Sequence, residues 1–172
     1  MTLYSCSIPM DRLLPHAAPM ILIDEVLERV DASLTAGVTV RADSIFFEAG
    51  RGIPAHVAIE WMAQTCGAFV GAEALERNLP VRLGMLLGTR EFRCDVPWFT
   101  DGERLTVTVA LIFRDDEMGA FDCTVARAAA QAGAQAADGE VLAKATLTLY
   151  QPADLAAVLA GQGVAGQGVA KG

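Results

Sequence analysis

Apolar residues along this chain follow two patterns, and each predicts a different kind of element. Between residues 33 and 41 they alternate with other residues, so that Leu34, Ala36, Val38 and Val40 share one face, as in a half-buried strand. Residues 20–30 also have the composition of a strand. The same holds for four later segments, residues 82–94, 105–113, 120–128 and 140–150.

The second pattern predicts a helix over residues 54–77. Nearly every position up to Glu73 is apolar or small, which indicates a helix buried on all sides. Pro54 suits the first position of a helix, where its missing N–H has no cost. The sequence NLP at residues 78–80 suits the end of that helix.

The order of these elements predicts the fold class. Two strands precede the long helix and four follow it, and one helix covers such a sheet only if the sheet curls around it. We therefore predict an α+β fold with an antiparallel sheet around a central helix. The remaining segments are predicted as a helical turn at 11–15, loops at 48–53 and 129–139, and a short helix at 152–160. We assign residues 1–152 to one domain and residues 153–172 to a short helix and a Gly- and Ala-rich tail without a function of its own.

Composition narrows the classes of function. The chain has 172 residues, is 53% hydrophobic and carries a formal net charge of −8. A chain this small and apolar is expected to bury part of its surface against another subunit. The negative charge argues against nucleic acid as a partner. No signal peptide and no apolar run long enough for a membrane span is found, so we expect a cytoplasmic protein.

The four cysteines do not predict a metal site or a disulfide framework. Cys6, Cys66, Cys94 and Cys123 are far apart and form no C-x-x-C pair. Reduced thiols are expected, with Cys66 as a small residue of the core.

The chemistry of the predicted helix centres on three polar residues. His56, Glu60 and Gln64 are spaced four residues apart, so that they share one helix face in an otherwise apolar segment. A buried carboxylate is costly unless it has a role, which makes Glu60 a candidate catalytic residue. The alternative is that the row only satisfies hydrogen bonds at a subunit interface. The one other histidine, His16, is a rival of His56 for a place near Glu60.

Three segments resemble the FabA/FabZ type of 3-hydroxyacyl-thioester dehydratases, which have the hot-dog fold. They are LLPHAAPMILIDEV (13–26), IEWMAQTCG (59–67) and LLGTREFRCDVPWFTDGE (86–103). The helix start, PAHVAIEWMAQT, is more similar to a divergent branch encoded with aryl-polyene and related fatty-acid-like pathways. The resemblance covers residues 11–150. It implies a hot-dog fold, a dimer and a reaction on acyl thioesters without a metal or another cofactor.

One departure from that family concerns its catalytic histidine. The main family carries it in a Gly-His-Phe-Pro loop before the helix, whereas FFEAGRGIP (46–54) stands here and contains no histidine. The carboxylate is carried over as Glu60, but the histidine is not. His56 and His16 are the two candidates to replace it. We slightly favour His56, because the helix fixes its position relative to Glu60.

Dehydration requires a base, an acid and a donor to the thioester carbonyl. We expect Glu60 to act as the acid and the N–H of Ala55, at the helix start, to be the donor. Gln64, Leu87 and Gly88 are the other expected substrate contacts. The sequence also contains a basic cluster, Arg82, Arg90 and Arg93. We expect it either to dock an acidic acyl carrier protein or a coenzyme A phosphate, or to be a solvated strand face.

Three functions remain open from the sequence. The first is dehydration of 3-hydroxyacyl chains bound to acyl carrier protein or coenzyme A. The second is an acyl thioesterase, in which a helix carboxylate acts with water. The third is a non-catalytic scaffold subunit that pairs with an active dehydratase. Fold similarity alone does not choose between these three functions. The subunit partner is either a second copy of this chain or another hot-dog subunit.

Overall fold

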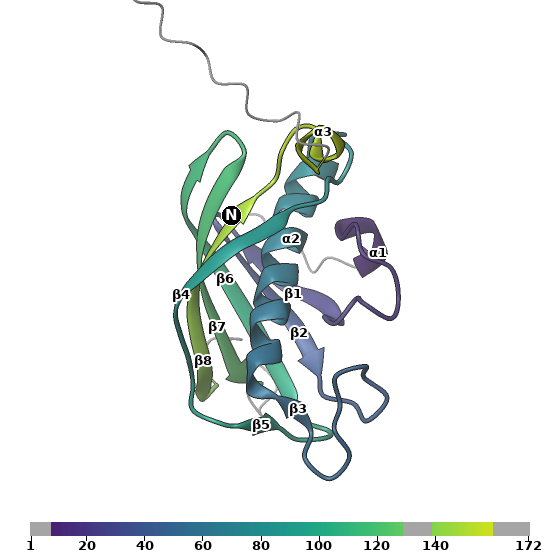
Figure 1. Cartoon of the computed structure of the whole chain (residues 1–172), viewed down its shortest axis with the longest axis vertical. Coiled ribbons are helices and arrows are strands. Elements are labelled where there is room, and N and C mark those ends of the chain that lie inside the picture. Colours follow the sequence, from purple (N-terminus) through teal and green to yellow (C-terminus); the bar gives the residue numbers. More distant parts are fainter. Residues whose placement is uncertain (1–7, 129–138, 160–172) are drawn as a thin grey trace, which may run out of the picture.

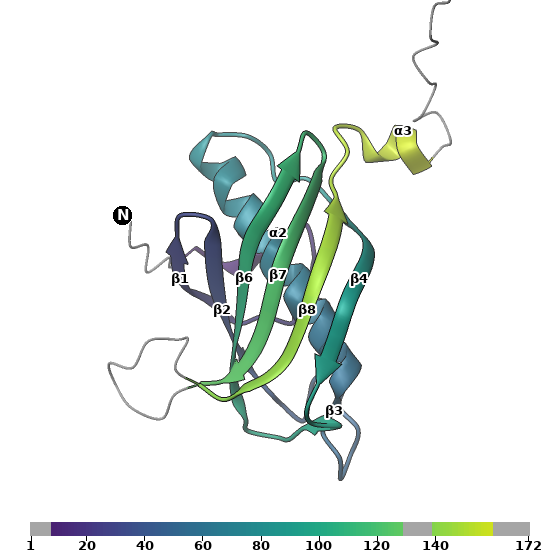
Figure 2. The same ribbon diagram turned by 90° about the vertical axis from the view of Figure 1, so that its left-hand side faces the viewer.

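The structure, a computed structural model, describes residues 8–128 and 139–159 of the chain. Six antiparallel strands form one sheet in the order β1-β2-β6-β7-β8-β4. The sheet curls around the long helix α2, Ala58–Glu76 (Figures 1 and 2). This is the α+β arrangement predicted from the sequence, and it is the hot-dog fold. The strands are β1 (Glu25–Val30), β2 (Ser33–Thr39), β4 (Met85–Cys94), β6 (Arg104–Asp115), β7 (Met118–Arg127) and β8 (Val141–Tyr150).

Small elements complete the fold. Helix α1 (Met10–Leu13) precedes the sheet, and α3 (Leu155–Leu159) follows it. The loop predicted at 48–53 ends in the two-residue strand β3 (Ile53–Pro54), which pairs with β5 (Trp98–Phe99). Pro54 therefore ends a strand, and the helical segment opens one residue later with the 3₁₀ turn η1 (Ala55–Val57). Cys6, most of the predicted loop 129–139 and most of the predicted tail lie outside the described residues.

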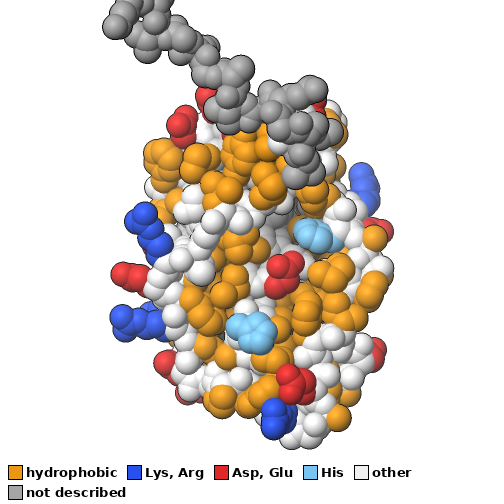
Figure 3. Space-filling view, viewed as in Figure 1, with side chains coloured by type: hydrophobic (Ala, Val, Ile, Leu, Met, Phe, Trp, Pro, Cys, Tyr) orange, Lys and Arg blue, Asp and Glu red, His pale blue; other side chains and the backbone are white. Residues whose placement is uncertain are grey.

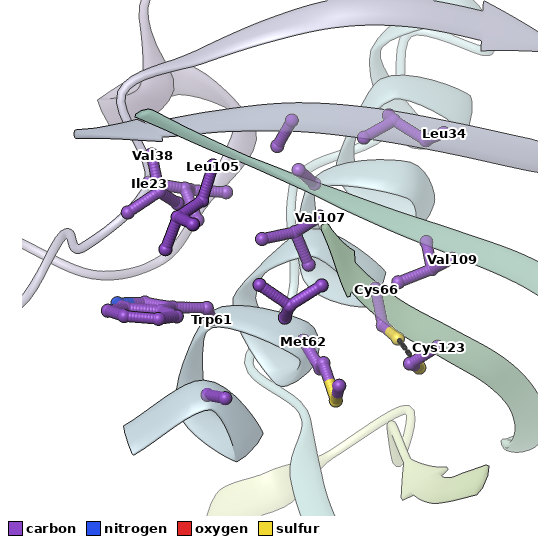
Figure 4. Close-up of a cluster of buried hydrophobic side chains, with 14 of the residues drawn as sticks. Ile23, Leu34, Val38, Trp61, Met62, Cys66, Leu105, Val107, Val109 and Cys123 are labelled. Atoms are coloured by element: carbon purple, nitrogen blue, oxygen red, sulfur yellow. Dashed lines mark hydrogen bonds between the residues drawn. The ribbon is translucent and has the colours of Figure 1, made fainter. Parts of the chain in front are cut away.

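The core lies between α2 and the concave face of the sheet (Figure 4). Trp61, Met62 and Cys66 of α2 are fully buried there, against side chains that include Val107 and Val109 of β6. The predicted face of the second strand is confirmed, because its four members, Leu34, Ala36, Val38 and Val40, are all buried. The all-round apolar pattern of α2 follows from its position, since the sheet, α1 and the preceding loops leave it little solvent contact.

Helix α1 packs directly on α2 through a glycine. A Cβ atom at Gly71 would overlap the carbonyl oxygen of Leu13, so only glycine permits this approach. Leu13 and Leu14 are buried beside it, and His16 follows two residues later. The contact between the two helices therefore sets where the segment that carries His16 lies.

Candidate active site

A cavity of about 310 Å³ runs along α2. Its helix wall extends from Glu60 through Ala63 and Gly67 to Ala74, which corresponds to about 21 Å at the rise of an α-helix. The opposite wall includes Leu86 of β4, Phe121 of β7 and Leu149 of β8. Figure 3 shows that hydrophobic side chains cover much of the face on which α2 lies. The cavity is thus elongated, and much of its lining is apolar.

Glu60 lies in this cavity and is held by Gln64 one turn further along α2. The Gln64 Nε2 group donates to Glu60 Oε1 at 2.9 Å and to the carbonyl oxygen of Met20 at 2.7 Å. The Gln64 Oε1 atom accepts from the N–H of Leu22 at 2.8 Å. Gln64 is only 2% exposed. Gln64 lines the cavity, as expected of a substrate contact, although its amide is already hydrogen-bonded within the protein.

His16 lines the same cavity as Glu60. Its Nδ1 atom is buried and has no hydrogen-bond partner among the described residues. Buried polar atoms are nearly always paired, so a buried ring nitrogen without a partner is an exception that a bound substrate could satisfy. His16 follows α1 and precedes the segment that Gln64 holds through Met20 and Leu22.

His56 does not share that position. It is exposed, belongs to η1 and is not among the residues that line the cavity. The preference for His56 assumed α-helical spacing from residue 56 to residue 60, but a 3₁₀ turn has three residues per turn and directs its side chains differently. In the structure His16, and not His56, lies in the cavity with Glu60.

The cavity lining does not include three other expected substrate contacts: Ala55, Leu87 and Gly88. The N–H of Ala55 donates to the carbonyl oxygen of Pro97 at 3.0 Å, so it is not free to polarise a thioester. Leu87 and Gly88 of β4 are exposed and do not line the cavity, whereas their neighbour Leu86 does. The pairing with Pro97 depends on a residue 42 positions away, which the local pattern of the sequence does not indicate.

The three arginines of the predicted basic cluster separate into two groups. Arg82 lines the cavity toward the C-terminal end of α2, together with Arg77. Arg90 and Arg93 are exposed on β4, outside the cavity. None of these side chains forms an ion pair within the described part of the chain.

Cys66 borders the cavity, and its thiol lies in the core beside that of Cys123 (Figure 4). Burial raises the pKa of this thiol well above its ordinary range, and a hydrogen bond to Cys123 adds to the effect. The side chain is therefore a neutral, poorly nucleophilic group near neutral pH.

Across residues 8–128 and 139–159, no group of three or more histidine, cysteine, aspartate or glutamate side chains is placed to hold a metal ion. Of the helices in these ranges, none has both the length and the apolar character needed to cross a membrane.

Comparisons with known proteins identify similar chains. Residues 8–160 match the family model ApeP-like, described as ApeP dehydratase. A chain in the solved structure of the dehydratase heterocomplex ApeI:P from Xenorhabdus doucetiae is 34% identical, with a TM-score of 0.80 over 92% of this chain and 100% of that chain. No curated protein sequence matches.

More distant structures are similar in fold alone. The Escherichia coli PaaI protein from the phenylacetic acid degradation operon is 10% identical, with a TM-score of 0.53 over 73% of this chain and 80% of that chain. A hypothetical thioesterase protein with coenzyme A from Streptococcus pneumoniae TIGR4 is 12% identical, with a TM-score of 0.54 over 74% of this chain and 84% of that chain.

Proposed function

Since the chain belongs to the ApeP-like dehydratase family, we propose that it removes water from 3-hydroxyacyl thioesters with Glu60 and His16 as the reacting pair. The observation that carries this assignment is that both side chains line one elongated cavity with much apolar lining. An acyl chain would lie along α2, with its thioester end beside Glu60. The aryl-polyene and related pathways are the setting that this proposal implies.

The proposed reaction needs two proton transfers. An imidazole nitrogen of His16 takes a proton from C2 of the acyl chain, and the electrons of that C–H bond form the C2=C3 double bond. The hydroxyl group leaves C3 as water after it accepts a proton from Glu60. The pair is restored when the proton on His16 returns to the Glu60 carboxylate. The products are a 2-enoyl thioester and water, so no oxidant or reductant is needed.

The thioester carrier is proposed from charge. A chain with a net charge of −8 needs a local basic surface to bind an acidic acyl carrier protein or the phosphates of coenzyme A. Arg90 and Arg93 on β4 supply exposed guanidinium groups that form no ion pair in the described part of the chain. Their end of β4 leads to β5, which pairs with β3 just before η1 and Glu60, so we assign the carrier to this side of the molecule. Arg77 and Arg82 lie at the other end of the cavity, away from Glu60.

A second subunit is also part of the proposal. Strand β4 forms one edge of the sheet, and most of its residues are exposed, including Leu86 and Leu87. An exposed strand edge is a template for pairing with another chain. The similar chain in the ApeI:P structure comes from a heterocomplex, which favours another hot-dog subunit as the partner, while a second copy of this chain fits the same edge.

The scaffold hypothesis keeps one specific observation in its favour, the loop 46–54 without a histidine. We propose to separate it from catalysis by incubating the purified chain with a 3-hydroxyacyl thioester of acyl carrier protein and following the acyl mass. Loss of water by the chain alone supports the dehydratase, and hydrolysis of the thioester indicates a thioesterase. An inactive chain that activates a separate hot-dog subunit indicates the scaffold.

A further inference from the structure

We propose that Gln64 is a positioning residue, which selects the oxygen of Glu60 that exchanges the proton and holds the His16 segment against α2. The inference rests on the proposed function, in which Glu60 and His16 react. It is carried by three hydrogen bonds of one buried amide, between 2.7 and 2.9 Å long.

The orientation of the Gln64 amide is determined by its partners. The N–H of Leu22 can only donate, so the atom that faces it must be the amide oxygen. The carbonyl oxygen of Met20 can only accept, so the atom that faces it must be the amide nitrogen. That nitrogen has one proton left, and it points to Glu60 Oε1. The flipped amide would face both backbone groups with the wrong atom, so only this orientation is stable.

This orientation distinguishes the two oxygens of Glu60. Oε1 accepts from Gln64, and the carbonyl-type oxygen of a carboxyl group is a better acceptor than its hydroxyl oxygen, so the proton of a protonated Glu60 is favoured on Oε2. No other side chain or backbone group in the described part of the chain donates to Glu60, which leaves Oε2 to the substrate. Gln64 thus favours Oε2 as the atom that transfers the proton.

The Gln64 amide also holds the segment that carries His16. Met20 and Leu22 follow His16 by four and six residues, and Gln64 bonds the backbone of both. These bonds hold the segment after α1 beside the helix, where His16 lines the cavity. Loss of the amide would therefore release Glu60 and loosen the segment of His16 at once.

The test compares Gln64→Leu with Thr65→Val. Thr65 is a suitable control because it is also fully buried on α2, and within the described residues its hydroxyl bonds only the carbonyl oxygen of Trp61. Both variants should melt at a lower temperature. Only Gln64→Leu should lower kcat, by about 100-fold with a small change in KM, because misplaced reacting groups affect the chemical step.

Two NMR measurements test the role of Gln64 without activity. In ¹³C-labelled protein, the carboxyl carbon of Glu60 is identified by its absence in Glu60→Gln. Its resonance should move in Gln64→Leu, because the donor to Glu60 Oε1 is lost. The Leu22 amide of Gln64→Leu should also exchange with deuterium faster than in the parent, because its acceptor is lost.

These outcomes separate the two proposals. If the Glu60 carboxyl resonance and the Leu22 exchange rate are the same in Gln64→Leu as in the parent, Gln64 is not a positioning residue, whatever the activity. If Thr65→Val changes them equally, the effect is general loosening and the proposal is wrong. If the NMR changes occur as expected but the parent does not dehydrate any substrate, the positioning holds and the proposed function fails.

Discussion

The Sγ atoms of Cys66 on α2 and Cys123 on β7 lie 3.9 Å apart in the core, between the central helix and the middle of the sheet (Figure 4). Both thiols are buried and reduced. Burial, followed by the hydrogen bond to Cys123, raises the pKa of Cys66 well above its ordinary range. This relationship links the stability of the fold to pH, because an unfolded thiol ionises at a lower pH than the folded one.

We therefore expect Cys66→Ala to cost stability at pH 7 but progressively less at alkaline pH. The folded state binds more protons than the unfolded state between the ordinary thiol pKa, about 8.5, and the raised pKa, so the contribution of Cys66 is complete below that range and falls as pH rises through it. The decline can reach about 1.4 kcal/mol per pH unit. Urea unfolding of parent and variant at pH 7 and pH 10 measures the difference, and a constant difference would contradict the prediction.

Glu60→Gln should reduce kcat by about 10²- to 10⁴-fold, the usual contribution of a general acid, because an amide keeps the shape of the side chain but cannot transfer the proton. The melting temperature should stay near that of the parent. Rates on a 3-hydroxyacyl carrier substrate, with circular dichroism melting as the control, give the answer. A variant as active as the parent would show that Glu60 is not the acid.

The two histidines should differ sharply. His16 lines the cavity, and its Nδ1 atom is buried without a partner in the described residues, so His16→Ala should lower kcat by about 100-fold or more. His56 is exposed outside the cavity, so His56→Ala should leave kcat and the melting temperature unchanged. If kcat falls equally in both variants, or only in His56→Ala, the assignment of His16 alone is wrong and His56 is again a candidate.

The extent to which the sequence predicted this molecule depends on the range of the interactions involved. The central helix and the six main strands were predicted because their composition or apolar pattern extends over many residues, as with the alternation around Val38 in β2. Strands β3 and β5 were missed because two residues have no period. The surroundings of Gln64 and the bond from Ala55 to Pro97 depend on contacts between distant segments, which local patterns do not contain.

Gly71 and Gly67 provide a matched test of how α1 sits on α2. Gly71→Ala should lower the free energy of unfolding by about 1–3 kcal/mol, because its methyl group would meet the backbone of Leu13, which cannot move without shifting α1. Gly67→Ala would meet only the end of the Leu14 side chain, at 3.1 Å, so a neutral effect or a gain of up to about 1 kcal/mol from helix propensity is expected. Urea unfolding of both variants measures this difference, and similar values would show that α1 adjusts freely.

Strand β4 should carry the subunit interface, and Leu87 tests it. This side chain is 54% exposed on an edge strand, where a lysine opposes pairing with another chain. We expect the parent to form a dimer, or a heterodimer when a hot-dog partner subunit is present, and Leu87→Lys to be monomeric by light scattering at micromolar concentration. Ile112→Lys is the control, because Ile112 is 55% exposed but lies on β6, which has a neighbour on each side. If Leu87→Lys remains a dimer while Ile112→Lys dissociates, the interface lies at the β6–β7 hairpin instead. If the parent is a monomer and also fails to bind a hot-dog subunit, the proposed interface does not exist.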